Sequence, residues 1–310
     1  MSAIHFTLFG SMRMYDDEKT EEIQLTSAIQ LLLAYLLLNR HRTCPRDVLL
    51  DLFWRELEED KARNCLNTAL WRLRKALKPY ETPTCVYLVS TTNGDIGFNP
   101  LSEYWLDVAE YTSRVKPILS LPVEQVDAEA IARLETTLDL YQGELLEGVY
   151  TDWAISEREH LRILHHNCLA YLMTYHRLQE DFGKALAYGQ KILEDDPLRE
   201  EIHRAIMRLH MACGQRTLAI RQYHICQAAL AQELTIAPME ETQILYQEIT
   251  GGAGGTSWVP ATQESSGPAQ TLTMLQQTLL SIDHIRSQVL QAIRFLEDDE
   301  DNSPNVTKSH

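Results

Sequence analysis

The chain has 310 residues, of which 45% are hydrophobic, and a formal net charge of −16 at pH 7. This length and apolar content fit two domains with packed cores, and the longest apolar run, Leu31–Leu38, is too short to span a membrane. The acidic total argues against indiscriminate nucleic-acid binding. Because there is no signal-peptide pattern and no C-x-x-C pair among the six cysteines, we expect a cytoplasmic protein with reduced thiols.

The charge is unevenly spread along the chain. Residues 1–99 carry 12 basic and 13 acidic side chains, whereas residues 100–250 carry 13 and 24. A near-neutral N-terminal region permits one local basic face, while the acidic remainder favours solubility and discourages non-specific DNA contacts. The charge alone therefore leaves both DNA binding and protein binding open.

The first elements in chain order predict a small sheet followed by two helices. Short runs of β-prone residues at 4–9, 12–15 and 23–25 predict the strands of a small antiparallel sheet. A helix that is apolar on most sides, and therefore central, is expected from about residue 26 to residue 39. Residues 43–54 predict a second helix with a proline in its first turn, where the missing N–H does no harm.

The next segment, Lys61–Lys78, is the most informative in the chain. It holds six Lys or Arg residues and no Asp or Glu. Four leucines at intervals of 4, 3 and 4 residues share one helix face: Leu66, Leu70, Leu73 and Leu77. The face opposite the leucines is either a functional surface or an ordinary solvated one, since Lys and Arg are common on solvated helix faces. That face presents side chains that can read base edges in a DNA major groove: Asn64, Asn67, Thr68, Trp71, Arg72, Arg74 and Lys75.

A β-hairpin is predicted over residues 87–98, where two β-prone runs flank an Asn-Gly turn. Strands, three helices with the third one basic, and then a hairpin are the order of a winged helix-turn-helix domain, which we assign to residues 1–100. In that arrangement the third helix enters the major groove while the second helix supports it. The hairpin becomes the wing, and Thr91, Thr92 and Asn93 are the residues placed to contact DNA.

From residue 101 to residue 250 the pattern is one helix after another, separated by turns that contain Gly or Pro. Lys184-Ala-Leu-Ala187 and Arg216-Thr-Leu-Ala219 each follow a Gly-containing turn and start 32 residues apart. This spacing is close to the period of tetratricopeptide helix pairs, which stack into a superhelix with a concave binding surface. The alternative is a helical bundle in which Ala and Leu recur by chance. The expected fold class is mainly α with a small β component.

Three further segments are predicted after the helices. Residues 251–270 are rich in Gly, Ser, Thr and Pro and predict a flexible linker. Residues 271–297 place Leu, Ile and Val at heptad positions, which predicts an amphipathic helix that pairs with itself or a partner, or folds back on the helical domain. The acidic residues 298–310 are predicted to be disordered.

No constellation of residues in the sequence indicates catalysis or a metal site. The eleven histidines show neither H-x-x-x-H spacing with an intervening Glu nor a cysteine at ligand spacing, so we expect surface or boundary histidines. There is also no nucleophile elbow, dinucleotide motif or P-loop. We therefore predict no enzymatic activity, no metal and no cofactor.

Several ordered motifs in the first 250 residues resemble the Streptomyces antibiotic regulatory proteins, a family of transcriptional activators. That family joins an OmpR/PhoB-type winged helix to a helical bacterial transcriptional activator domain of tetratricopeptide type. Phe6-Thr-Leu-Phe-Gly10 is similar to the family's opening strand, and Arg46-Asp-Val-Leu-Leu-Asp-Leu-Phe-Trp54 to its second helix. Trp71-Arg-Leu-Arg-Lys-Ala-Leu77 is similar to the end of its recognition helix.

The resemblance continues through the helical region. Trp105-Leu-Asp-Val-Ala-Glu-Tyr111 is similar to the segment that joins the family's two domains. Residues 195–201, 207–214 and 231–238 resemble three landmarks of its helical domain, in the same order. The resemblance therefore implies a winged helix over residues 1–100 and a transcriptional activator domain over residues 101–250.

The resemblance also implies a function and a set of contact residues. The chain would bind double-stranded promoter DNA as a homodimer or in tandem on repeated half-sites, and it would contact RNA polymerase. Thr68, Arg72 and Arg74 match the positions expected to make base or near-base contacts. The full set of candidates is Arg63, Asn64, Asn67, Thr68, Trp71, Arg72, Arg74 and Lys75 on the helix, with Thr91, Thr92 and Asn93 on the wing.

Two positions depart from the family's pattern. Gly94-Asp95 stands where a Gly-Tyr pair is usual in the wing, and an acid there repels phosphate. Trp71 stands where a smaller residue is common, which changes the base preference or serves packing. A tetratricopeptide scaffold whose winged helix does not read DNA is therefore the competing hypothesis, and it predicts negligible DNA binding even at low salt.

Overall fold

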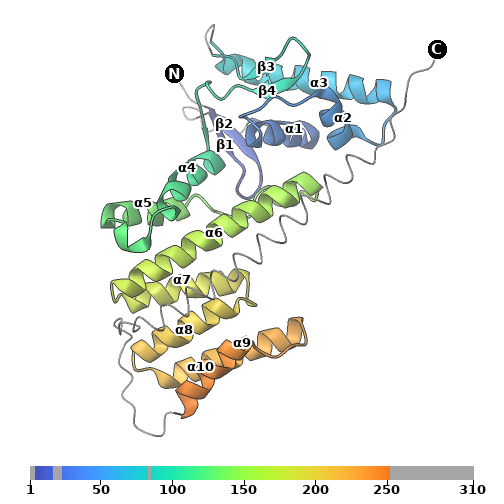
Figure 1. Cartoon of the computed structure of the whole chain (residues 1–310). Coiled ribbons are helices and arrows are strands. Elements are labelled where there is room, and N and C mark those ends of the chain that lie inside the picture. The colour runs from blue at the N-terminus through green and yellow to red at the C-terminus, as the bar shows by residue number, and fades with distance from the viewer. Residues whose placement is uncertain (1–3, 17–22, 83–84, 252–310) are drawn as a thin grey trace, which may run out of the picture. The chain divides into compact units, whose positions relative to one another are not determined.

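The structure is a computed structural model that describes residues 4–16, 23–82 and 85–251, all within one compact unit. A small β component at the N-terminus is followed by a mainly helical remainder (Figure 1), so the predicted fold class is confirmed. Three predicted segments lie outside the described residues: the linker 251–270 beyond its first residue, the helix 271–297 and the tail 298–310.

The N-terminal sheet has three strands in the order β2-β1-β5. The central strand β1 (Ile4–Thr7) pairs antiparallel with β2 (Arg13–Asp16) and parallel with β5 (Tyr104–Leu106). Ile4 and Phe6 are fully buried, as the alternation along β1 requires. The first two predicted strands are therefore present.

The strand predicted at residues 23–25 is wrong. These residues lie outside every strand, although the N–H of Ile23 donates to the carbonyl of Met14 at 2.8 Å. The third strand is β5, which comes from the far end of the winged helix and lies parallel to β1. A short apolar run indicates β propensity but not the partner strand, and a parallel partner always lies far along the chain.

Three helices follow the first two strands. The central helix α1 (Ser27–Leu38) is buried along most of its length. It is followed by α2 (Arg46–Trp54), which Pro45 immediately precedes, and by α3 (Glu59–Leu77). Both α1 and α2 pack against α3. All three predicted helices are present, and α3 contains the basic segment except for Lys78.

The predicted hairpin is formed by β3 (Leu88–Ser90) and β4 (Ile96–Phe98), which pair antiparallel. The short 3-10 helix η1 (Lys78–Tyr80) connects α3 to this region. In the turn Gly94 has φ +87°, a backbone conformation that residues with a side chain rarely adopt. The glycine of the Asn-Gly turn is therefore required by the backbone.

The remaining helices stack in successive layers (Figure 1). Neighbours α6 and α7, α7 and α8, and α8 and α9 pack against one another. The two echoed tetrapeptides lie at the starts of α7 and α9, the second helices of the pairs α6–α7 and α8–α9. This is the tetratricopeptide-like arrangement predicted. The elements are α4 (Asp107–Leu119), η2 (Val123–Gln125), α5 (Ala128–Leu138), α6 (Asp152–Leu178), α7 (Phe182–Asp195), α8 (Glu200–Ala212), α9 (Arg216–Glu233) and α10 (Glu240–Gly251).

Asp107, the first residue of α4, links the winged helix to the helical region. It is buried, and its carboxylate accepts the N–H groups of Leu8 and Phe9 at 2.7 and 2.8 Å and that of Val108 at 2.7 Å. Burial raises the pKa of Asp107 to about 6, although the three backbone N–H donors oppose this shift. One carboxylate thus holds the end of β1 at the start of α4.

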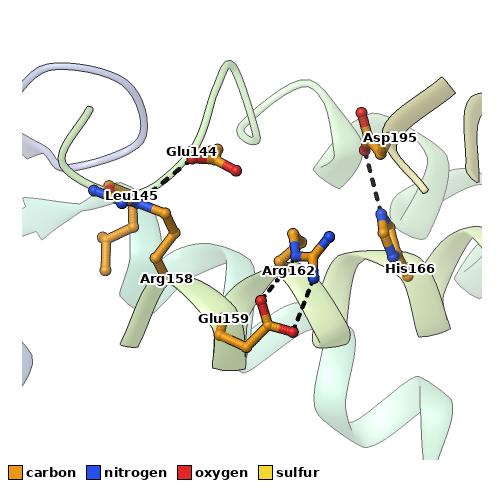
Figure 2. Close-up of polar contacts among 7 residues, drawn as sticks. All are labelled: Glu144, Leu145, Arg158, Glu159, Arg162, His166 and Asp195. Carbon is orange, nitrogen blue, oxygen red and sulfur yellow. Dashed lines mark hydrogen bonds and ion pairs between the residues drawn. The ribbon is translucent and has the colours of Figure 1, made fainter. Parts of the chain in front are cut away.

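Arg158 of α6 makes a second link within the core (Figure 2). Its guanidinium donates to the carbonyl oxygens of Leu145, Leu146 and Val149 at 2.8, 2.7 and 2.8 Å. The carboxylate of Glu144 lies 3.6 Å from the same group, and the Arg158 side chain is only 13% exposed. The loop between α5 and α6 is therefore held by a nearly buried arginine.

The expectation of surface or boundary histidines is wrong for three of them, which are buried: His166, His176 and His203. Each has a polar partner from another part of the helical region. The ring of His166 lies 3.3 Å from the carboxylate of Asp195 (Figure 2), and that of His176 lies 2.9 Å from Glu135. A buried polar group is tolerated when it is hydrogen-bonded, and the partners come from elements that the sequence alone does not bring together.

Two further features of the described residues bear on other site types. No described helix is long and apolar enough to cross a membrane. Within the same residues, no group of three or more His, Cys, Asp or Glu side chains lies close enough to hold a metal ion.

Candidate nucleic-acid interface

The helix α3 divides into a buried and an exposed face as its sequence predicts. Leu66, Leu70, Leu73 and Leu77 are at most 1% exposed and pack into the core of the winged helix. All eight candidates on this helix are exposed, and Figure 1 shows α3 on the side of the winged helix away from α6. The leucines therefore fix the rotation of α3 about its axis and turn its polar face outward. The exposed candidates are Arg63, Asn64, Asn67, Thr68, Trp71, Arg72, Arg74 and Lys75.

Several of these side chains are already engaged within α3. Trp71 is 60% exposed, and the ammonium of Lys75 lies 5.3 Å from the centroid of its ring, within the range of a cation–π contact. The hydroxyl of Thr68 donates to the carbonyl of Asn64 at 2.8 Å, which leaves its methyl group for an apolar contact. Arg63 pairs with Glu59 one turn earlier, so its charge is partly compensated.

The side chains of Arg72 and Asn64 make no hydrogen bond or ion pair with any residue in the described part of the chain. Both line a hollow of about 300 Å³ that also contacts the start of α1, at Thr26, and the end of α2, at Trp54. Exposed donors without an internal partner are free to meet a ligand. The centre of the polar face is therefore the part of α3 least used by the fold itself.

The wing lies beside the C-terminal half of α3. The guanidinium of Arg74 donates to the hydroxyl of Ser90 on β3 at 3.0 Å. Thr91 is exposed but structural, because its carbonyl accepts the N–H of Gly94 at 3.0 Å and its hydroxyl that of Asp95 at 3.1 Å. The other two wing candidates, Thr92 and Asn93, are exposed.

The structure adds two residues, Arg46 and Ser90, to the candidate contact residues predicted from the sequence. Arg46, the first residue of α2, is half-buried and its guanidinium donates to Oδ1 of Asn67 on α3. Ser90 is the wing partner of Arg74. Neither was among the candidates, because the pattern of one helix says nothing about side chains that reach it from neighbouring elements.

Fold and surface together define a winged helix-turn-helix protein with a polar, partly basic face on its third helix. Two families match the chain in agreement with this. Residues 20–94 match the family described as "Transcriptional regulatory protein, C terminal", and residues 106–250 match the "Bacterial transcriptional activator domain". Both families are named for transcriptional regulation.

Known proteins are similar to most of the chain. Regulatory protein AfsR of Streptomyces coelicolor is 29% identical over 252 residues, which is 80% of this chain but only 24% of AfsR. Transcriptional regulatory protein MoaR1 of Mycobacterium tuberculosis is 22% identical over 267 residues, 80% of this chain and 79% of MoaR1. Mycobacterium tuberculosis EmbR, solved with a low-affinity phosphopeptide, has the same fold with a TM-score of 0.68, 18% identity and coverage of 91% of this chain and 72% of its own.

The chain therefore belongs to the DNA-binding transcriptional regulators that join an OmpR/PhoB-type winged helix to a bacterial transcriptional activator domain. This is the Streptomyces antibiotic regulatory protein type that the sequence motifs resemble. The chain spans about a quarter of the length of AfsR, so its correspondence to that relative concerns these two domains.

Proposed function

We propose that this protein activates transcription by binding promoter repeats through α3 and the wing. The observation that supports this most directly is the exposed polar face of α3, which has Arg72 and Asn64 at its centre without partners among the described residues. Arginine pairs with guanine and asparagine with adenine in the major groove, so these free groups suit base readout.

The contact residues divide by role within this proposal. Thr68, Arg72 and Arg74 contact bases or lie next to them, whereas Arg63, Trp71 and Lys75 flank them and contact phosphates. Asn64 and Asn67 lie on the same exposed face. On the wing, Thr92 and Asn93 reach the DNA backbone, while Thr91 shapes the turn.

The helical domain provides the second half of the proposal. Taken as residues 101–250, it contacts RNA polymerase or a second protomer, so that two copies occupy repeated half-sites as a homodimer or in tandem. Support comes from the family resemblance and from the stacked helix pairs α6–α7 and α8–α9, an architecture that forms extended binding surfaces.

The test is fluorescence anisotropy of the purified chain against DNA tiled from upstream of its own gene, over a salt series, beside Arg72→Ala. We expect tight, salt-dependent binding to one tile that the variant loses. In vitro transcription from that tile then separates activation from repression. Negligible binding to every tile at low salt would contradict the proposal and favour the protein-interaction scaffold.

A further inference from the structure

Arg46 lies where α2, α3 and the wing of the winged helix meet. It begins α2, and its guanidinium donates to Oδ1 of Asn67 on the exposed face of α3. The wing turn approaches the aliphatic part of the Arg46 side chain. A Cβ atom built at Gly94 would lie 3.6 Å from the Cδ of Arg46. The side chain of Arg46 is thus held between α3 and the wing.

The position of Arg46 is not explained by the stability of its own helix. A cation in the first turn of a helix is disfavoured by the helix dipole, which prefers acids such as the adjacent Asp47 there. The guanidinium instead reaches across to α3. Its partner, Asn67, is an exposed candidate for base readout.

The contact with Arg46 determines which end of the Asn67 amide faces outward. Asparagine has an acceptor oxygen and a donor amino group, whereas arginine has donors only. Oδ1 of Asn67 therefore points to Arg46, and the donor end remains for a ligand. The bidentate contact of asparagine with adenine needs both ends, since Oδ1 accepts from N6 while the amino group donates to N7.

Asn64 provides the contrast on the same helix face. Its side chain is exposed and has no hydrogen-bond partner within the described residues. It keeps both ends of its amide and is free to make the bidentate adenine contact. The two asparagines therefore differ in what they offer to DNA, although they are the same residue type on the same face of α3.

We propose that Arg46 is a positioning residue that makes Asn67 a hydrogen-bond donor to DNA, so that Asn67 selects against cytosine and does not prefer adenine over guanine and thymine. Guanine offers O6 and N7, thymine O4 and adenine N7 as major-groove acceptors, while cytosine offers only a donor. Adenine loses its usual advantage because the acceptor end of Asn67 is held by Arg46. The inference rests on the proposed function, since it requires α3 to read DNA.

The test is selection of binding sites from a random-sequence DNA library with the full chain. Loss of one base position in Asn67→Ala identifies the position that Asn67 reads, and we expect guanine and thymine there at least as often as adenine in the wild type. In Arg46→Met this position should shift toward adenine by about fivefold in relative affinity, the effect of one hydrogen bond. The positions that Arg72→Ala alters should stay unchanged.

Two further variants separate positioning from general effects. Arg46→Lys keeps a donor to Asn67 and should keep the wild-type preference. Asn67→Asp replaces the outward donor with an acceptor and should shift the position to cytosine, whose N4 group donates. The matched control is Arg55→Met at the other end of α2, where Arg55 pairs with Asp51 at 2.8 Å; it removes the same charge and should leave the motif unchanged.

The outcomes distinguish this inference from the proposed function. A wild-type motif that Arg46→Met and Asn67→Asp leave unchanged overturns the inference alone. A preference for adenine over guanine and thymine at the Asn67 position of the wild-type motif does the same. A wild-type chain that enriches no sequence overturns the proposed function and this inference with it.

Discussion

Arg158 and Arg72 carry the same guanidinium group in opposite settings. Arg158 on α6 is 13% exposed and donates to three backbone carbonyls of one loop. Arg72 on α3 is exposed and has no hydrogen-bond or ion-pair partner among the residues that the structure describes. A buried arginine must satisfy its donors inside the protein, whereas an exposed one can leave them for a ligand.

The same contrast separates the two regions to which these residues belong. At the junction of the winged helix and the helical region, Asp107 and Arg158 bond to backbone groups, so a change there should act on stability. On the outer face of α3 the side chains of Arg72 and Asn64 have no partner among the described residues, so a change there should act on binding. Four predictions test this division between stability and binding, in order of decreasing expected effect.

Replacing Arg158 with Met should have the largest effect. The carbonyls of Leu145, Leu146 and Val149 would lose their donor, and we expect a loss of about 3–5 kcal/mol in the free energy of unfolding. Urea unfolding followed by circular dichroism measures it. Arg162→Met is the matched control, since Arg162 pairs with Glu159 on its own helix (Figure 2) and should cost less than about 1 kcal/mol. Equal losses in the two variants would contradict the division.

A pH dependence of stability should arise from His165, which stacks on Tyr141 with ring centroids 3.9 Å apart. Burial lowers the pKa of His165 from its ordinary 6.5 to about 4. The unfolded chain therefore binds a proton between these values while the folded chain does not. The contribution of His165 to the free energy of unfolding is therefore complete above pH 6.5, and about 3 kcal/mol of it is lost as the pH falls to 4.

The variant His165→Phe isolates that contribution. The raised pKa of Asp107 acts in the opposite direction, because its stabilising contribution is present below 3.8 and is lost as the pH rises through about 6. We therefore compare unfolding free energies of wild type and variant at each pH. The advantage of the wild type should shrink from pH 6.5 to pH 4, and an advantage that is constant across this range would refute the assignment.

Replacing Arg72 with Ala tests the other side of the division. Because Arg72 has no partner among the described residues, the free energy of unfolding should change by less than about 0.5 kcal/mol. Binding to the selected DNA site should weaken by about 1–3 kcal/mol if Arg72 contacts a base. Anisotropy titration and urea unfolding of the same preparation measure both. A large loss of stability would place Arg72 among the structural residues.

The smallest effect is expected for Lys75→Ala. The ammonium of Lys75 lies over the ring of Trp71, which holds it at the edge of the exposed face. As a phosphate contact it should contribute similarly to binding on all sequences. We expect the slope of log affinity against log salt to fall by about one. An unchanged slope with altered base preference would assign Lys75 to the bases.

Much of this organisation was accessible from local patterns. The leucine spacing of α3 predicted its buried face, and the Asn-Gly pair predicted the hairpin turn at Gly94. The echoed tetrapeptides, 32 residues apart, indicated the helix pairs. Seven of the eight candidates on α3 followed from the same periodicity, and all eight are exposed; their contacts with DNA stay a prediction. Periodicity reports which side of an element faces the core.

The errors and omissions share one physical cause. The third strand is β5 rather than residues 23–25, and His166, His176 and His203 are buried against partners from other elements. By itself the sequence determined the three helices and the hairpin of the winged helix, the faces of α3 and the family resemblance. Only the tertiary structure decided which polar groups are satisfied within the protein, as Arg158 is, and which remain free for a ligand, as Arg72 does. That difference depends on partners distant in the sequence, which no local pattern specifies.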